Sequence, residues 1–351
     1  MFRKIFTVIF VLILSVVKVY ALSADDISAE CAVLMTAQTG EVIFAKEEHK
    51  KHSMASTTKI MTSLLAVESG RLSDEITVTQ DMLNVEGTSM GLLGGDSVSL
   101  RELVYGMLLP SGNDAAEVTA LYLGETKEEF CALMNARAKE LGMNDTNFVT
   151  PSGLDDENHY STAYDMALLG REAVKNPEFL RICSSVKASL TYGNPPYERT
   201  LHNHNRLLSS YDGALGIKTG FTKKSGRCLV SYAQRNGVGL VAVTLNDGND
   251  WDDHVRMLDY GFSEVSASEP DMNIPETENV VGGQSETVKL QHEKFVIEST
   301  AENIVYRVFL PRFIYAPVET DDVIGRVDIY SCGELIESVP ITAAENVSIK
   351  T

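Results

Sequence analysis

The chain has 351 residues, more than a single hydrophobic core usually holds, so we expect two domains. Its residues are 44% hydrophobic and 23% charged, which is typical of a globular protein and excludes a disordered one. A formal net charge of −19 argues against nucleic acid as a partner and against unaided docking on anionic lipid.

The N-terminus has the pattern of a secretory leader. A short basic region, Met1-Phe2-Arg3-Lys4, precedes an apolar stretch from Ile5 to Val17, and small residues follow at Ala21 and Ala24. This stretch is too short to span a bilayer, which takes ~20 residues, although an uncleaved anchor is the alternative. We therefore predict a signal peptide over residues 1–24 and an exported, extracytoplasmic mature protein.

A hairpin and a helix are predicted next. Residues 31–35 and 41–46 have β-strand patterning on either side of a glycine-containing turn. Apolar residues then recur at helical spacing over 60–65, and Gly70 ends the run as a helix stop would.

The residues that lead into this helix include a Ser-x-x-Lys pattern, Ser56 and Lys59. If the helix begins near Ser56, Lys59 lies one turn later on the same face, within reach of the Ser56 hydroxyl. A serine hydroxyl becomes a good nucleophile when a base takes its proton, and a desolvated lysine with a lowered pKa can do so. The alternative interpretation is a serine near a helix start followed by a solvated lysine.

A second polar motif lies between two predicted helices. A strand is predicted over 75–80 and a helix over 100–109, which Pro110 ends. Ser111-Gly112-Asn113 then makes a turn, and Asp114 begins the next apolar-periodic helix. Such a turn presents small polar side chains held from both sides, but turns of this composition are also common as plain helix connections.

The remaining elements of this part are helices followed by strands. We predict helices over 126–141 and 161–174 (with Ser161 as N-cap), a strand over 213–220, strands over 227–234 and 239–245, and a helix over 251–260. The first of these strands ends in Lys218-Thr219-Gly220. Asn236-Gly237 between the last two is a strong hairpin signal. The order of elements predicts an α/β (α+β) domain over residues 25–265.

From about residue 266 the pattern is that of strands alone. Strand-like segments cover 286–298, 303–310, 322–330 and 333–341. A proline-containing linker precedes them, so we predict a small all-β domain over residues 276–351. The tail carries no amphipathic helix, so peripheral membrane association through it has no support in the sequence.

Three short motifs therefore stand in order along the chain: Ser56-x-x-Lys59, Ser111-Gly112-Asn113 and Lys218-Thr219-Gly220. Penicillin-binding proteins and class A β-lactamases carry the same set, with Ser-Asp-Asn as the middle element. With its leader and appended β-domain, the chain resembles the low-molecular-mass penicillin-binding proteins, the serine-type D-Ala-D-Ala carboxypeptidases of peptidase family S11. The middle motif, with glycine between serine and asparagine, and the segment Asn203-His204-Asn205-Arg206 are more typical of this family than of β-lactamases.

The resemblance implies a transpeptidase-like fold, with an antiparallel five-stranded sheet, covering helices and a helical subdomain around an active-site cleft. It implies that Ser56 attacks the carbonyl between the two terminal D-alanines of a peptidoglycan stem peptide, and that water later hydrolyses the acyl-enzyme. Lys59 is the expected base, and Ser111 is expected to relay a proton to the leaving amine. β-lactams would acylate Ser56 as covalent inhibitors.

The resemblance also implies residues that hold the substrate. Lys218 and Thr219 would bind the terminal carboxylate, and the charge of Lys218 would bias Lys59 toward its neutral form. No cofactor and no metal are implied, and the five cysteines form neither a disulfide framework nor a zinc site. The implied substrate-binding residues are Asn113, Lys218, Thr219 and Gly220, and the implied oxyanion-hole donors are the backbone N–H groups of Ser56 and Phe221.

One departure concerns the substrate carboxylate. Members of this family often place an arginine shortly before the last helix of the catalytic domain, but residues 246–254 are acidic and contain none. Either Arg206 or Arg256 takes this role, or Lys218 and Thr219 suffice.

Other classes of function have less support. A Ser-His-Asp hydrolase would need a G-x-S-x-G motif, which is absent. A β-lactamase would need a deacylating base, for which Glu68 is one candidate. A secreted module that captures cell-wall peptide or β-lactam without turnover is a third possibility, against which the intact Ser56, Lys59, Ser111 and Lys218 argue.

Overall fold

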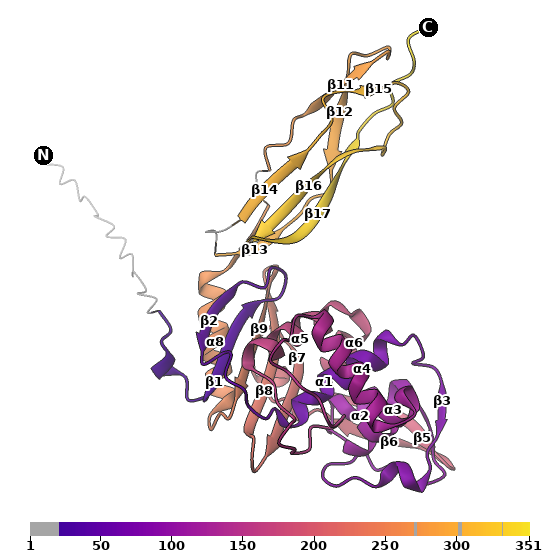
Figure 1. The fold of residues 1–351 in the computed structure, drawn as a ribbon, viewed down its shortest axis with the longest axis vertical. Helices are drawn as coiled ribbons and strands as arrows, with labels where there is room; N and C mark the ends of the chain where they lie inside the picture. The colour runs from indigo at the N-terminus through magenta and orange to yellow at the C-terminus, as the bar shows by residue number, and fades with distance from the viewer. Residues whose placement is uncertain (1–20, 270–271, 301–303, 332) are drawn as a thin grey trace, which may run out of the picture.

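The computed structural model describes residues 21–269, 272–300, 304–331 and 333–351. It consists of an α/β part that comes first in the chain and an elongated β part that carries the C-terminus (Figure 1). Most of the predicted signal peptide, residues 1–20, lies outside the described residues. Within the described ranges, no helix is both long and apolar enough to cross a bilayer.

Five antiparallel strands form the central sheet of the α/β part, as the resemblance implies. The strands are β1 (Cys31–Thr36), β2 (Val42–Lys46), β7 (Ala214–Thr222), β8 (Gly226–Arg235) and β9 (Val238–Leu245). Their order is β2-β1-β9-β8-β7, so β9 is central and each of its residues is buried. β7 is an edge strand, so one side of its backbone is unpaired within the sheet.

Helices cover both faces of this sheet, and alternate side chains of each strand point to opposite faces. α5 (Ala163–Lys175) packs on one face and α8 (Asp250–Glu264) on the other. In β1, Val33 belongs to the apolar cluster on the α5 side, whereas Leu34 belongs to the cluster on the α8 side. Burial on both faces explains why β1 reads as a continuous hydrophobic run in the sequence.

A buried histidine lies between the sheet and α8. His254 is fully buried, and its two ring nitrogens lie 2.6 Å from Ser231 Oγ and 3.0 Å from Thr244 Oγ1. Burial lowers the pKa of His254 to about 3, so the ring stays neutral and both nitrogens are satisfied by hydroxyls. We assign it a structural role in holding α8 to β8 and β9.

A helical subdomain lies beside the β7 edge of the sheet (Figure 1). Its main helices are α1 (Lys59–Glu68), α2 (Leu100–Leu108), α3 (Asn113–Gly124), α4 (Lys127–Glu140) and α6 (Pro177–Cys183). The predicted helices match these except for α6, which the sequence analysis missed. The predicted N-cap of α5 is wrong by one residue, because Thr162 accepts the hydrogen bond from Asp165 N while the Ser161 hydroxyl lies against Thr146.

Short elements complete this part. They are two-stranded sheets of β3 (Glu75–Thr77) with β4 (Ser97–Ser99) and of β5 (Lys187–Gly193) with β6 (Pro196–His202), the helix α7 (Leu207–Ser210), and 3-10 turns over Ala24–Asp26, Ala55–Thr58 and Gln80–Leu83. The strand predicted over 75–80 is therefore only three residues long, because the 3-10 turn follows it. The β5–β6 hairpin was not predicted, since only its turn is marked in the sequence.

The C-terminal part is all β, as predicted. Its strands are β11 (Thr277–Val281), β12 (Thr287–His292), β13 (Ile297–Ser299), β14 (Ile304–Phe309), β15 (Ile314–Tyr315), β16 (Val323–Ser331) and β17 (Glu334–Ala343). Six of them form one sheet in the order β14-β16-β17-β12-β11-β15, with apolar clusters of its own. We propose that the domain boundary lies between residues 265 and 276, which these separate clusters support.

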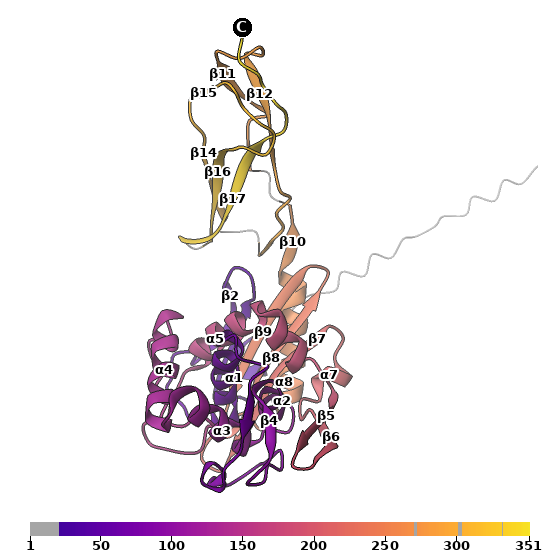
Figure 2. The ribbon, with the colours of Figure 1, turned by 90° about the vertical axis from the view of Figure 1, so that its right-hand side faces the viewer.

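β13 connects the two parts. It pairs with β10 (Ser266–Ser268), which follows α8 and leads up to the C-terminal part (Figure 2). The Glu298 carboxylate of β13 accepts hydrogen bonds from Gln38 N at 3.1 Å and from Gly239 N at 2.9 Å.

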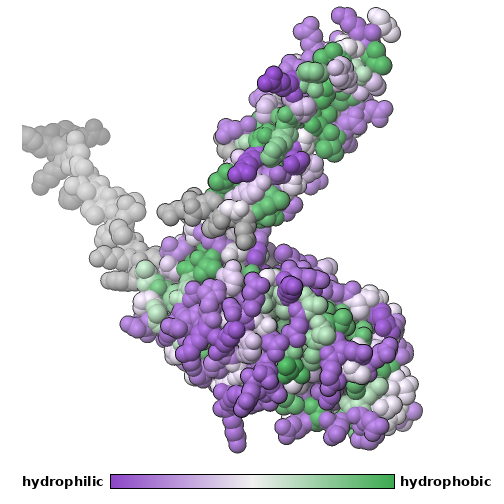
Figure 3. Space-filling view, viewed as in Figure 1, coloured by the Kyte–Doolittle hydropathy of each residue, from purple (hydrophilic) through white to green (hydrophobic). Residues whose placement is uncertain are grey.

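Figure 3 shows mainly hydrophilic side chains over the α/β part in this view, in keeping with the net charge.

Candidate active site

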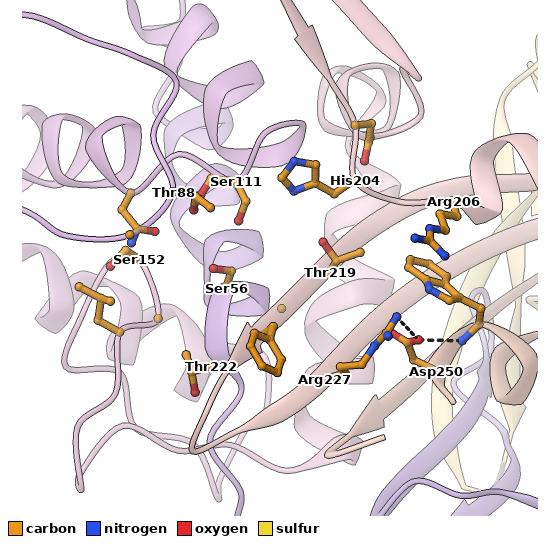
Figure 4. A pocket seen from close by; sticks show the side chains of 18 residues that line it. Ser56, Thr88, Ser111, Ser152, His204, Arg206, Thr219, Thr222, Arg227 and Asp250 are labelled. Atoms are coloured by element: carbon orange, nitrogen blue, oxygen red, sulfur yellow. Dashed lines mark hydrogen bonds and ion pairs between the residues drawn. The ribbon is translucent and has the colours of Figure 1, made fainter. Parts of the chain in front are cut away.

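A cavity of about 890 Å³ opens between the β7 edge of the sheet and the helical subdomain. Most of the residues that the sequence analysis singled out line it, although they come from segments far apart in the chain (Figure 4). Those that line the cavity are Ser56, Ser111, Asn113, Thr219, Gly220 and Phe221. Lys59 and Lys218, the two predicted lysines, are buried in the cavity wall.

Ser56 lies in the 3-10 turn that precedes α1 rather than in the helix itself. Ala55 has a positive φ of 47°, a left-handed conformation that costs a non-glycine residue about 1–2 kcal/mol. This turn aims the Ser56 hydroxyl into the cavity (Figure 4). Lys59 begins α1 one turn later. Spacing alone therefore predicts the Ser56–Lys59 contact, but not the strained residue before Ser56.

Lys59 is fully buried and has three oxygen neighbours. Its Nζ lies 2.9 Å from Ser56 Oγ, 2.7 Å from Asn113 Oδ1 and 2.7 Å from Ser152 O. Burial, assisted by the charge of Lys218, lowers the pKa of Lys59 well below its usual value, against the opposing effect of Asp114.

Burial favours the neutral amine, which has two N–H bonds and one lone pair. Asn113 Oδ1 and Ser152 O can only accept, so they take the two N–H bonds of Lys59. In this neutral form the lone pair is left for the Ser56 hydroxyl, whose Oγ lies 2.9 Å from Nζ. The arrangement can therefore remove the Ser56 proton, as a general base must.

Ser111 and Asn113 are held at the turn between α2 and α3. Ser111 has a φ of +65°, and its carbonyl accepts a hydrogen bond from Thr88 Oγ1 at 2.6 Å. Asn113 Nδ2 donates to Glu86 O at 2.6 Å, which orients the amide so that its oxygen faces Lys59. The residues around Thr88 thus fix this motif from the side of the cavity opposite β7.

Lys218 lies on β7, almost completely buried, and its Nζ donates to Thr219 O at 2.8 Å. Burial lowers the pKa of Lys218 to about 7. Its charge also lowers the pKa of Lys59 and of the nearby His204. The charge of Lys218 thus favours a neutral Lys59.

Gly220 allows β7 to pack directly on the turn that carries Ser56. A Cβ added at Gly220 would lie 3.0 Å from Met54 O and 3.1 Å from Ser56 N. Any side chain here would push β7 away from the backbone N–H of Ser56. The absence of a side chain therefore brings this N–H and the exposed edge of β7 to the same end of the cavity.

The structure distinguishes between the two arginines considered for binding the substrate carboxylate. Arg206 lines the cavity and is exposed, with its guanidinium 5.9 Å from the centre of the Trp251 ring (Figure 4). Arg256 does not line it, because its guanidinium bonds Asp253 at 2.9 Å. A further arginine, Arg227, lines the cavity and was missed.

Arg227 is paired with the buried Asp250, at 2.7 Å. It lies opposite Phe221 in the β7–β8 register. A hairpin register drawn from the sequence would therefore have placed it near the predicted oxyanion hole. Ser152 was also missed, since it contributes a backbone carbonyl and has no motif of its own.

Glu68 is not placed to act in this cavity. It is exposed at the end of α1, where both carboxylate oxygens accept hydrogen bonds from Arg137. This removes the one candidate for a β-lactamase's deacylating base that the sequence analysis named. Among the described residues, no group of three or more His, Cys, Asp or Glu side chains is arranged to hold a metal ion.

The loop over residues 149–153 packs tightly against the Ser56 turn, and Gly153 is the point of closest approach. A Cβ added at Gly153 would lie 1.9 Å from Ala55 O, and its φ is +85°. Left-handed strain alone costs a non-glycine residue about 1–2 kcal/mol of stability. We expect Gly153→Ala to lower the stability by more than this, and so to lower the melting temperature. Thermal unfolding of purified protein measures this.

Gly142→Ala is the matched control for Gly153→Ala. Gly142 has a similar φ of +77°, but an added Cβ would meet nothing within 4 Å. Equal losses of melting temperature in the two variants would contradict the tight contact between Gly153 and the Ser56 turn.

Comparisons with known proteins identify the family of the chain. The family model of D-alanyl-D-alanine carboxypeptidases, peptidase family S11, matches residues 18–249. The D-alanyl-D-alanine carboxypeptidase DacF of Bacillus subtilis is 30% identical over 91% of this chain and 85% of its own. The crystal structure of the D-alanyl-D-alanine carboxypeptidase DacD from Francisella tularensis superposes with a TM-score of 0.67, at 28% identity, over 94% of this chain and 95% of that one.

Penicillin binding protein 5 from Haemophilus influenzae gives a TM-score of 0.68 at 27% identity, over 93% of this chain and 99% of that one. The relatives span both the α/β part and the β part, so the resemblance drawn from the three motifs is confirmed. The chain belongs to peptidase family S11, the serine-type D-alanyl-D-alanine carboxypeptidases.

Proposed function

We propose that the protein is an exported DD-carboxypeptidase that removes the terminal D-alanine from peptidoglycan pentapeptide through an acyl-Ser56 intermediate. The single observation that carries this proposal is the environment of Lys59. Its Nζ lies 2.9 Å from Ser56 Oγ, while Asn113 Oδ1 and Ser152 O occupy its two N–H bonds. A buried, neutral amine in this position is the base that a serine nucleophile needs.

In the first half of the reaction, Ser56 Oγ forms a bond to the carbonyl carbon between the two D-alanines, and its proton passes to Lys59. The carbonyl oxygen becomes an oxyanion, which the backbone N–H groups of Ser56 and Phe221 stabilise. When the C–N bond breaks, the leaving amine of D-alanine takes a proton relayed by Ser111. The product is an ester of Ser56.

In the second half, a water molecule adds to this ester. Lys59, neutral again after giving up its proton, takes one proton from the water, and the ester bond to Ser56 breaks. The tetrapeptide leaves with a free carboxylate, and Ser56 recovers its hydroxyl proton. A β-lactam is proposed to follow only the first half at a useful rate, and would therefore inhibit the enzyme as a long-lived acyl adduct.

Substrate binding is proposed to use the edge of β7 and the cationic side of the cavity. The stem peptide would pair with the free edge of β7 as an added strand, next to Asn113. Its terminal carboxylate would lie near Thr219 and the cations Lys218 and Arg206. Arg206 is preferred over Arg256 because it lines the cavity and its guanidinium is exposed there.

The test is a paired measurement on the mature protein. D-alanine release from a pentapeptide ending in D-Ala-D-Ala should occur, and labelled penicillin should form a stable adduct. Rapid hydrolysis of the penicillin would instead indicate a β-lactamase. Neither adduct nor D-alanine release would indicate a binding module and would overturn the proposal.

A further inference from the structure

One carbonyl group next to the nucleophile is held unusually firmly. The Ala55 carbonyl and the Ser56 N–H belong to the same planar peptide group, and in a trans peptide they point in opposite directions. Whatever fixes Ala55 O therefore also fixes the direction of the Ser56 N–H. That N–H is one of the two proposed oxyanion donors, so its direction matters to the chemistry.

A chain of three hydrogen bonds ends on Ala55 O. Val149 N lies 3.1 Å from His159 Nδ1, and a backbone N–H can only donate. His159 Nδ1 is therefore unprotonated, so the ring proton is on Nε2, which lies 2.8 Å from Thr58 Oγ1.

Thr58 completes this chain. Its hydroxyl accepts from His159 Nε2 and donates its own hydrogen to Ala55 O, at 2.8 Å. Each hydrogen bond in the chain can therefore run in one direction only, so the positions of its hydrogen atoms are fixed.

The chain is shielded from water and carries no net charge. His159 is 3% exposed and Thr58 is fully buried. The Phe148 ring lies edge-on to the imidazole, with the ring centres 5.9 Å apart. Burial lowers the pKa of His159 to about 4, although Asp156 and Asp155 oppose this shift. The imidazole is therefore neutral at neutral pH.

We infer that His159 is a positioning residue, which acts through Thr58 and the Ala55 carbonyl to aim the Ser56 N–H at the oxyanion. It does not line the cavity, and its ring nitrogens bond Thr58 and Val149 N rather than the Ser56 hydroxyl. Ala55 has a left-handed φ, and strained backbone of this kind persists only where its surroundings hold it in place. This inference rests on the proposed acyl transfer by Ser56.

Two pairs of variants separate positioning from folding. His159→Asn keeps an acceptor near Nδ1 but loses the donor to Thr58, whereas His159→Gln keeps an N–H near the place of Nε2. Thr58→Val removes the hydroxyl at constant volume, and Thr58→Ser retains it. We expect His159→Asn and Thr58→Val to slow acylation by labelled penicillin by about 10- to 100-fold, below the 10²–10³ that loss of an oxyanion donor costs. His159→Gln and Thr58→Ser should recover most of the rate.

A spectroscopic measurement reports on the oxyanion hole itself. Hydrogen bonds to an ester carbonyl lower its stretching frequency, so the infrared band of the penicilloyl ester should move to higher frequency in His159→Asn and Thr58→Val. His159→Gln and Thr58→Ser should leave it near the wild-type position. Because both losses break the same chain, the double variant His159→Asn/Thr58→Val should be no slower than the slower single variant.

His254→Gln provides the matched control. His254 is also a buried, neutral histidine with both ring nitrogens bonded, but its partners Ser231 and Thr244 do not line the cavity. This variant should lower the melting temperature without changing the acylation rate or the carbonyl band.

Folded His159→Asn and Thr58→Val proteins with wild-type acylation rates and carbonyl bands would overturn the inference. Additive losses in the double variant would do so as well. Failure of the wild-type protein to form any penicillin adduct would instead overturn the proposed function, so the two failures are distinguishable. If His159→Asn does not fold, the Thr58 pair decides the question alone.

Discussion

Replacing Ser56 with alanine is expected to abolish D-alanine release and covalent labelling by penicillin. The Ser56 hydroxyl is the proposed attacking group, and it lies 2.9 Å from Lys59 Nζ at the floor of the cavity. No acyl-enzyme can form without that oxygen, so the loss should reach the detection limit of the assay. The fold should survive, because only one partly buried hydroxyl is removed from a turn whose backbone bonds remain.

Ser63→Ala is the matched control for this experiment. Ser63 is a buried serine of α1, within the same stretch of chain, but its hydroxyl faces Met107 Sδ at 3.9 Å and not the cavity. It should be labelled like the wild type. Thermal unfolding establishes that both variants fold, and mass spectrometry of the labelled wild-type protein locates the adduct. An adduct that persists in Ser56→Ala would show that another residue is the nucleophile.

Replacing Lys59 with alanine is the second prediction with a large effect. Loss of a general base typically slows a reaction by 10²–10⁴-fold, and we expect acylation by penicillin to slow within that range. The variant keeps the Ser56 hydroxyl, so slow labelling should remain after long incubation. Stopped-flow or gel-based labelling at several penicillin concentrations measures the acylation rate.

Lys46→Ala is the corresponding control, because Lys46 Nζ also donates to a backbone carbonyl, Ile27 O at 2.7 Å, but far from the cavity. Its acylation rate should equal that of the wild type. Near-normal acylation in Lys59→Ala would move the base role to another residue, for which Lys218 would be the first candidate.

The pH dependence of kcat/KM gives an independent check on Lys59. Burial lowers its pKa and so favours the neutral amine, and lowering the pH protonates it and removes the lone pair. Activity should therefore fall on the acid side. On the alkaline side, Lys218, whose pKa is lowered to about 7, loses the charge that would attract the substrate carboxylate. Lys59→Ala should lose the acid limb of this bell-shaped profile.

The sequence was most informative where function depends on side chains at fixed spacing. Ser56 and Lys59 are one helical turn apart, so their contact follows from local geometry alone. Strand periodicity likewise located all five strands of the central sheet, because burial on one or both faces leaves a regular pattern. The meeting of the three motifs in one cavity did not follow from the residues themselves, and rested on the resemblance to a known family.

The parts that could not be predicted depend on the backbone or on tertiary packing. Ser152 reaches Lys59 through its carbonyl, which any residue would provide. His159 stands 101 residues from Thr58, and its role depends on a ring proton whose position only Val149 N decides. α6 was missed because it has only seven residues and follows α5 directly, with Asn176 serving as the C-cap of α5 and the N-cap of α6.

The unpaired edge of β7 has a consequence for the range of peptides that the enzyme can process. A peptide that adds to a strand edge is recognised through its main chain, so its direction and the chirality of each residue decide whether it fits. Side chains alternate to either side of such a strand, and those that point to solvent contribute little to the fit. Stem peptides that differ at a solvent-facing residue should therefore lose their terminal D-alanine at similar rates. A peptide with an L-residue at the scissile bond should not be hydrolysed.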